Sequence, residues 1–99
     1  MNKQQHLNSF DELQIIFKQS GILKQYSIHR LGVFGSFARN EPSNDIDLLI
    51  EDDLPLETAL QFKNELETLI KNPLDIMVKR WANPIVLYRA EEEIRYVER

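Results

Sequence analysis

Two short motifs in the first half of the chain combine residue types that can bind phosphate groups and divalent metal ions. The first is the turn Gly35-Ser36, which follows an apolar run, and the second is the pair Asp45 and Asp47, which opens another apolar run. Side chains two residues apart on a strand point to the same face. Two such carboxylates can share divalent cations, which lie about 3.5–4 Å apart in two-metal sites. Free backbone N–H groups in a Gly-Ser turn suit a polyphosphate. The pattern indicates metal-assisted phosphoryl or nucleotidyl transfer.

The two aspartates begin a segment that alternates like a β-strand. The apolar residues at every second position are Ile46, Leu48 and Ile50. Because successive side chains of a strand point to opposite faces, we predict a strand over residues 45–51 with both aspartates on the face opposite the core.

A third acidic residue, Asp75, lies at a matching position in a later segment. The apolar residues that alternate with it are Leu74, Ile76 and Val78. This alternation predicts another strand, with Asp75 on the face opposite the apolar side chains. If the two strands are neighbours, Asp45, Asp47 and Asp75 share one face of the sheet.

The rest of the sequence predicts helices around these strands. Ser9-Phe10-Asp11-Glu12 has the form of a capping box, and the apolar spacing behind it predicts a helix over residues 10–20 that resumes over 23–26. We also predict a strand over residues 28–34, a helix between Pro55 and Asn72-Pro73, and a helical segment in one or two pieces over 85–97. The order α-β-β-α-β-α indicates an α/β (α+β) fold class, a small mixed sheet packed with helices.

Composition limits the classes of function. A chain of 99 residues with 42% hydrophobic residues can form one domain with one modest core, with residues 1–8 expected to be a frayed tail. The net charge of −4 disfavours direct nucleic-acid binding, and the lack of cysteine excludes disulfides and thiolate metal sites. No apolar run is long enough for a signal segment or a membrane span, so we expect a cytoplasmic protein.

Other residues of types that often occur in functional sites have ordinary structural explanations. We expect the run Glu91-Glu92-Glu93 to be a solvated helix face, and Trp81 and Tyr88 to be core or interface residues.

The motif spacing resembles that of the nucleotidyltransferase superfamily of DNA polymerase β and kanamycin nucleotidyltransferase. At this length the chain looks most like the minimal nucleotidyltransferase (MNT) proteins, the short partners of HEPN proteins in toxin–antitoxin pairs. The residues that match the family motifs GSxAR and DxDL and its third carboxylate are Gly35, Ser36, Ala38, Arg39, Asp45, Asp47, Leu48 and Asp75. Two positions depart from the pattern: Asn40 replaces a glycine and Asn44 replaces a serine. Because asparagine tolerates left-handed backbone, Asn40 can keep the same turn.

The resemblance implies a polymerase β-like palm fold, two Mg²⁺ ions and ATP as substrate. It implies that Gly35 and Ser36 hold the β- and γ-phosphates, and Arg39 is either a further phosphate ligand or a solvated arginine. The implied metal ligands and catalytic residues are Asp45, Asp47 and Asp75. The implied reaction is in-line attack of a hydroxyl on the α-phosphorus, with release of pyrophosphate.

The sequence has little room for an acceptor site, so the acceptor must come from another chain or a second copy. The resemblance implies a HEPN partner whose tyrosine hydroxyl receives AMP, and thus a type VII-like antitoxin. One alternative is a non-catalytic antitoxin that acts by binding alone. Another is a small-molecule nucleotidyltransferase of the antibiotic-modifying kind, assembled as a homo-oligomer.

Overall fold

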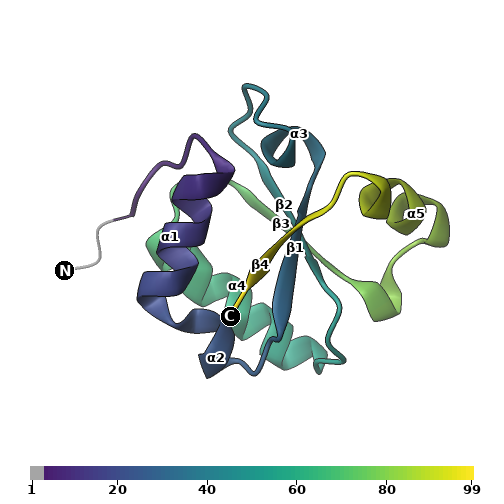
Figure 1. Cartoon of the computed structure of the whole chain (residues 1–99). Coiled ribbons are helices and arrows are strands. Elements are labelled where there is room, and N and C mark those ends of the chain that lie inside the picture. The colour runs from purple at the N-terminus through teal and green to yellow at the C-terminus, as the bar shows by residue number, and fades with distance from the viewer. Residues whose placement is uncertain (1–3) are drawn as a thin grey trace.

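The computed structural model describes residues 4–99, which form a four-stranded mixed sheet with helices on both sides (Figure 1). The strands are β1 (Arg30–Phe34), β2 (Ile46–Ile50), β3 (Leu74–Val78) and β4 (Arg95–Glu98). Their order in the sheet is β3-β2-β1-β4. Strand β1 is antiparallel to both β2 and β4, whereas β2 and β3 are parallel. The predicted fold class, a small mixed sheet packed with helices, is confirmed.

The helices divide unequally between the two faces of the sheet. They are α1 (Phe10–Ser20), α2 (Ile22–Gln25), α3 (Gly35–Ala38), α4 (Leu56–Leu69), the 3-10 turn η1 (Lys79–Trp81) and α5 (Pro84–Glu92). Helices α1, α2 and α4 lie on one side, α5 lies on the other, and α3 lies at one end of β1 and β2 (Figure 1). No helix among residues 4–99 is long and apolar enough to cross a membrane.

Local signals define the ends of α1 and the start of α5. The Ser9 side chain accepts a hydrogen bond from the Glu12 backbone N–H, and Gly21 ends α1 in the left-handed conformation at φ +64°. The predicted bounds of this helix are therefore confirmed. Asn83 caps α5 by accepting from the Ile85 N–H, with Pro84 at the first helical position.

The main core lies between the sheet and helices α1, α2 and α4. Its fully buried side chains from the strands and from α4 include Leu31, Val33, Ile46, Leu48, Ile50, Phe62 and Leu66. The opposite face of the sheet has a thinner apolar layer under α5. There the Ile94 side chain packs directly over Gly32, and a Cβ at Gly32 would collide with it.

The segment before α1 is ordered, so the predicted frayed tail is wrong for residues 5–8. Gln5 donates its N–H to the Leu69 carbonyl at 3.0 Å and accepts from the Lys71 N–H at 2.8 Å. Leu7 is buried. The side chain of the buried Asn72 accepts a hydrogen bond from the Leu7 N–H and donates one to the Leu7 carbonyl. Residues 1–3 of the predicted tail lie outside the described residues.

The C-terminal segment is helical only in part, which corrects the prediction of helix over residues 85–97. Helix α5 ends at Glu92, and the chain then forms β4 along β1. Pairing with β1 supplies hydrogen bonds that outweigh the helical character of the local sequence, and such pairing is not visible in local periodicity.

Candidate functional site

Gly35 and Ser36 directly follow β1 and begin α3, at the end of β1 where Phe34 is paired with Asp47 of β2. Gly35 has φ +73°, a conformation that side-chain-bearing residues rarely adopt. A Cβ at this position would lie 2.5 Å from Asp47 Oδ2. Glycine is therefore needed both for the backbone conformation and for the close approach of the Asp47 carboxylate to the turn.

The β2–β3 register brings two of the predicted carboxylates side by side. Asp47 on β2 is paired with Asp75 on the parallel strand β3, so the two strands are neighbours, which the sequence alone left open. Asp45 lies directly before β2 and is exposed. The alternating residues Ile46, Leu48 and Ile50 are fully buried, which confirms that Asp47 belongs to the opposite face of β2. Asp45 lies outside the strand that was predicted to contain it.

Negative charge accumulates around Asp47. Partial burial raises the pKa of the Asp47 carboxyl, and the carboxylates of Asp75, Asp45 and Glu93 raise it further. As the side chains stand, no three Asp, Glu or His residues within residues 4–99 are close enough together to hold a metal ion. The backbone register thus aligns Asp47 with Asp75, whereas the three carboxylates do not converge to ligand distance.

Arg39 is exposed to solvent and is also held by hydrogen bonds to its neighbours. Its guanidinium donates to the Glu41 carboxylate at 2.9 Å, to Ser36 Oγ at 3.3 Å and to Glu93 Oε2. The Glu41 and Glu93 carboxylates raise the pKa of Arg39. Glu93 Oε1 also accepts a hydrogen bond from the Gly35 backbone N–H at 3.2 Å.

The two asparagines that depart from the family motif have identifiable structural roles. Asn40 has φ +58°, so it adopts the left-handed conformation expected from a residue that replaces glycine. Its Oδ1 accepts from the Phe10 N–H at 3.5 Å. Asn44 Oδ1 lies 3.2 Å from His6 Nε2, which connects the loop before β2 to the N-terminal segment.

An open pocket of about 350 Å³ gathers several of the predicted site residues. Its lining consists of Phe34, Gly35, Ser36, Arg39, Asp47, Val86, Arg89, Ala90 and Glu93. The pocket therefore unites the phosphate-binding candidates with one metal-ligand candidate. Asp45 and Asp75 do not line it.

Two polar residues of this pocket were not anticipated from the sequence. Arg89 lies on α5 and Glu93 is the residue that caps its C-terminal end; with Val86 they follow a helical spacing. The prediction that Glu93 is part of a solvated face is wrong, because it is half-buried and bonds Gly35 and Arg39. Glu91 and Glu92 are exposed as expected. The helical spacing of Val86, Arg89 and Glu93 could have identified them as pocket residues only if the position of α5 over the sheet had been known.

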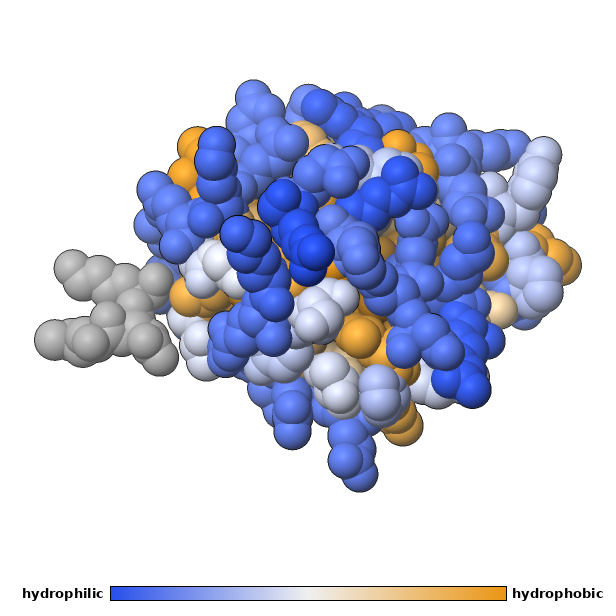
Figure 2. All heavy atoms as spheres, turned by 60° about the horizontal axis from the view of Figure 1, so that its bottom comes forward, coloured by the Kyte–Doolittle hydropathy of each residue, from blue (hydrophilic) through white to orange (hydrophobic). Residues whose placement is uncertain are grey.

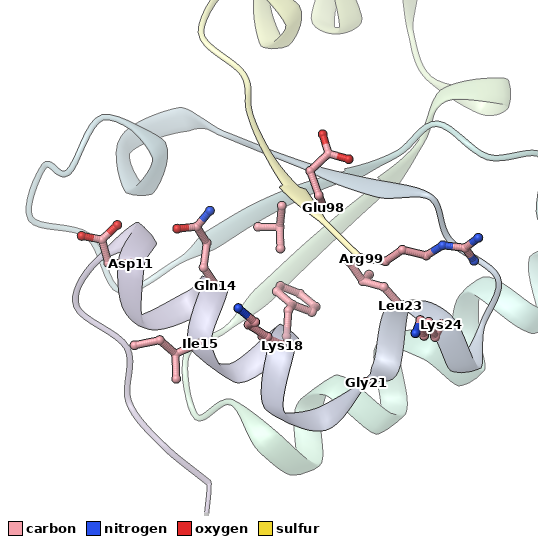
Figure 3. Close-up of a pocket in the computed structure, with 11 residues that line it drawn as sticks. Asp11, Gln14, Ile15, Lys18, Gly21, Leu23, Lys24, Glu98 and Arg99 are labelled. Atoms are coloured by element: carbon pink, nitrogen blue, oxygen red, sulfur yellow. The ribbon is translucent and has the colours of Figure 1, made fainter.

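A larger cavity of about 680 Å³ lies elsewhere, between α1, α2 and the end of β4 (Figure 3). Figure 3 shows Lys18, Lys24 and Arg99 around it, with Ile15 and Leu23 as apolar neighbours. None of the predicted site residues lines this cavity.

Comparison with known proteins identifies the family. Residues 18–96 match the family described as "Polymerase beta, Nucleotidyltransferase". The chain belongs to this polymerase beta nucleotidyltransferase family. The matched region contains the Gly35-Ser36 turn, the Asp45–Asp47 pair and Asp75, which are the motifs that suggested it.

Similar proteins agree with this assignment. A candidate protein adenylyltransferase of Methanocaldococcus jannaschii, MJ0126, is 32% identical over 90 residues, which cover 85% of this chain and 92% of that protein. The solved structure of a candidate minimal nucleotidyltransferase matches with a TM-score of 0.65 at 22% identity, over 88% of this chain and 94% of that chain. A chain in the complex of the tri-AMPylated Shewanella oneidensis HEPN toxin with its MNT antitoxin matches with a TM-score of 0.63 at 17% identity, over 89% and 71% of the two chains. At these identities the two solved structures support the fold alone.

Proposed function

We propose that this member of the nucleotidyltransferase family transfers an adenylyl group from ATP to a hydroxyl group of a protein partner. The observation that carries the proposal is the close approach of the Gly35 turn to Asp47, in a pocket that also contains Arg39. Phosphate-binding and metal-binding groups must be this close for a nucleotide to contact both.

The phosphates of the nucleotide would bind at the glycine end of the pocket. Gly35 and Ser36 offer backbone N–H groups, and Arg39 can form paired charge-assisted hydrogen bonds with phosphate oxygens. Arg89 adds a second guanidinium from α5. These groups would hold the β- and γ-phosphates and orient the α-phosphorus toward the carboxylates.

Asp45, Asp47 and Asp75 fit a Mg²⁺ site by their chemistry. They offer only carboxylate oxygens, which Mg²⁺ prefers. Burial raises the pKa of Asp47 most, and the nearby carboxylates raise it further; a bound cation would offset that repulsion. When bound there, Mg²⁺ would neutralise charge on the phosphates and lower the pKa of the acceptor hydroxyl. The protein's own contribution is to hold the phosphates and the acceptor oxygen in line.

The acceptor would be carried by a second protein. The exposed fractions of the apolar side chains Trp81, Ile85 and Tyr88 on η1 and α5 are 53%, 66% and 67%. Val86, from the same helix, is 45% exposed and lines the pocket. Figure 2 shows apolar patches at the end of the molecule that carries α5, among mostly hydrophilic side chains. Such a surface suits a protein partner that covers the pocket edge.

We propose a HEPN protein as the partner and a tyrosine hydroxyl as the acceptor, so that the protein would act as a type VII-like antitoxin. The tri-AMPylated HEPN toxin in complex with its MNT antitoxin supports this choice. In the proposed step the tyrosine oxygen bonds to the α-phosphorus, the bond to the β-phosphate oxygen breaks, pyrophosphate leaves, and the hydroxyl proton passes to water.

The test is intact-mass spectrometry of a HEPN protein from the same genome after incubation with this protein, ATP and Mg²⁺. We expect a mass increase of one or more AMP units, which peptide mapping places on tyrosine. The matched control replaces ATP by its α,β-methylene analogue, whose α–β linkage cannot be cleaved, and it should give no increase. A modification on a residue without a hydroxyl would contradict the assigned acceptor.

The second candidate function is an antitoxin that neutralises its partner by binding alone. It is favoured by the absence, within residues 4–99, of three carboxylates at metal-ligand distance. A HEPN ribonuclease that is inhibited by this protein yet stays unmodified would support this function and overturn the enzymatic one.

A further inference from the structure

The Glu93 carboxylate already occupies the groups to which we assign phosphate binding. One of its oxygens accepts from the Gly35 N–H at 3.2 Å, and the other pairs with the Arg39 guanidinium. A phosphate oxygen bound by the same N–H and the same guanidinium would need the same space. An anion from the chain itself therefore sits where the nucleotide's anion is expected.

The backbone on both sides of Glu93 brings this residue close to Gly35 and Arg39. In the antiparallel β1–β4 ladder, Val33 is paired with Arg95 and Gly32 with Tyr96. The paired register ends there, with Gly35 two residues after Val33 and Glu93 two residues before Arg95, so the ladder ends close to the contact between Gly35 and Glu93. Glu93 also ends α5, where its N–H bonds the Ala90 carbonyl, so two elements determine its position.

The Glu93 carboxylate is bound by two donors, the Gly35 N–H and the Arg39 guanidinium, that can bind other oxyanions equally well. Charge-assisted hydrogen bonds from a guanidinium and a backbone N–H stabilise a carboxylate and a phosphate in the same way. Arg39 and Glu93 are partly solvent-accessible, with side chains 42% and 35% exposed. A partly exposed pair of this kind is weak enough for a polyphosphate to displace.

We propose that Glu93 is an internal competitor of the nucleotide: it holds the phosphate site in the free protein and must leave Gly35 and Arg39 when a polyphosphate binds. This inference rests on the proposed function, because it assumes that the nucleotide's phosphates bind at Gly35 and Arg39.

The test is calorimetric binding of inorganic tripolyphosphate to the full chain in EDTA, followed by ATP with Mg²⁺. We expect Glu93→Gln to bind tripolyphosphate about two- to fivefold more tightly than the native chain, because one partly exposed charged contact no longer has to be broken. The matched control is Glu92→Gln, which removes the same charge from an exposed neighbour and should bind close to native affinity. Thermal unfolding checks that each variant folds.

A second measurement uses the native chain alone. In amide NMR spectra, tripolyphosphate should shift the signals of Gly35 and Glu93 together, with one common dissociation constant. Equal affinities for the native chain and Glu93→Gln, or a Gly35 shift with an unmoved Glu93, would overturn the competition and leave the proposed function standing. Absence of tripolyphosphate and ATP binding in all variants would instead overturn the proposed function, and this inference with it.

Discussion

The two faces of the sheet differ in both their cover and their chemistry. The face toward α1, α2 and α4 buries Leu31, Val33 and Leu48 completely. The face toward α5 carries Asp47 and Asp75 and is covered by one helix with a pocket beside it. Apolar burial is the dominant favourable term in folding. Most of the stabilising burial therefore lies on the face toward α1, α2 and α4. The face toward α5 can hold the like charges of Asp47 and Asp75, because their repulsion is small beside that burial.

The largest expected effect on stability comes from removing a buried side chain from the core between the sheet and α4. Phe62 is fully buried, and its ring meets Tyr26 edge-on with centroids 5.5 Å apart. We expect Phe62→Ala to lower the free energy of unfolding by about 3–5 kcal/mol, a large part of the ~5–15 kcal/mol typical of a domain. Urea unfolding followed by circular dichroism measures this loss. Leu60→Ala, at a 51% exposed position of the same helix, should cost less than about 1 kcal/mol. Equal costs at the two positions would contradict the view that burial in the core under α4 is the source of this stability.

A single substitution on the face toward α5 should instead remove activity and leave the fold intact. We expect Asp47→Asn to reduce AMP transfer at least about 100-fold, because a proposed metal ligand is lost. Without metal its melting temperature should rise slightly, since one charge leaves the group formed with Asp45, Asp75 and Glu93. Transfer of labelled AMP and thermal unfolding in EDTA measure the two effects.

The control for this variant is Asp53→Asn, an exposed aspartate that pairs with Arg80 outside the pocket, and it should stay active. Full activity in Asp47→Asn would exclude Asp47 as a metal ligand. A melting temperature well below native would show that Asp47 contributes to folding instead.

The smallest expected effect concerns Tyr96, on the α5 side of β4. Its hydroxyl donates to Glu51 at 3.0 Å, and burial together with this contact raises the pKa of Tyr96 above 10.0. The neutral phenol is thus favoured in the folded state, so its stabilisation is complete below pH 10 and is lost as the pH rises through the raised pKa. We expect Tyr96→Phe to cost about 0.5–1 kcal/mol at pH 8 and to lose less stability than the native chain above pH 10. Denaturant unfolding at pH 8 to 11 measures both; identical pH profiles would contradict the role of the Glu51 contact.

Much of the local structure follows from the sequence. The Ser9 cap and the Gly21 stop define α1, and the alternation around Asp47 and Asp75 assigns both to the face opposite the core, as the structure confirms. The left-handed Asn40 was likewise expected from its position in the motif. These features depend on side chains that lie close together along the chain, so the order of residue types is enough to predict them.

The β4 strand and the position of Glu93 could not be predicted in this way. Residues 85–97 are locally consistent with helix, and only pairing with β1 turns Arg95–Glu98 into a strand. That pairing joins segments about sixty residues apart and depends on the whole sheet having formed.

The sequence by itself therefore supplied the candidate residues for phosphate and metal binding, and the faces of the strands that carry Asp47 and Asp75, because both follow from residue type and strand periodicity. Only the tertiary structure decided that Asp47 stands beside Asp75, that α5 brings Arg89 to the pocket, and that Glu93 contacts Gly35. The physical reason is that strand order, register and the packing of a helix over a sheet are set by contacts between distant segments, which no local pattern encodes.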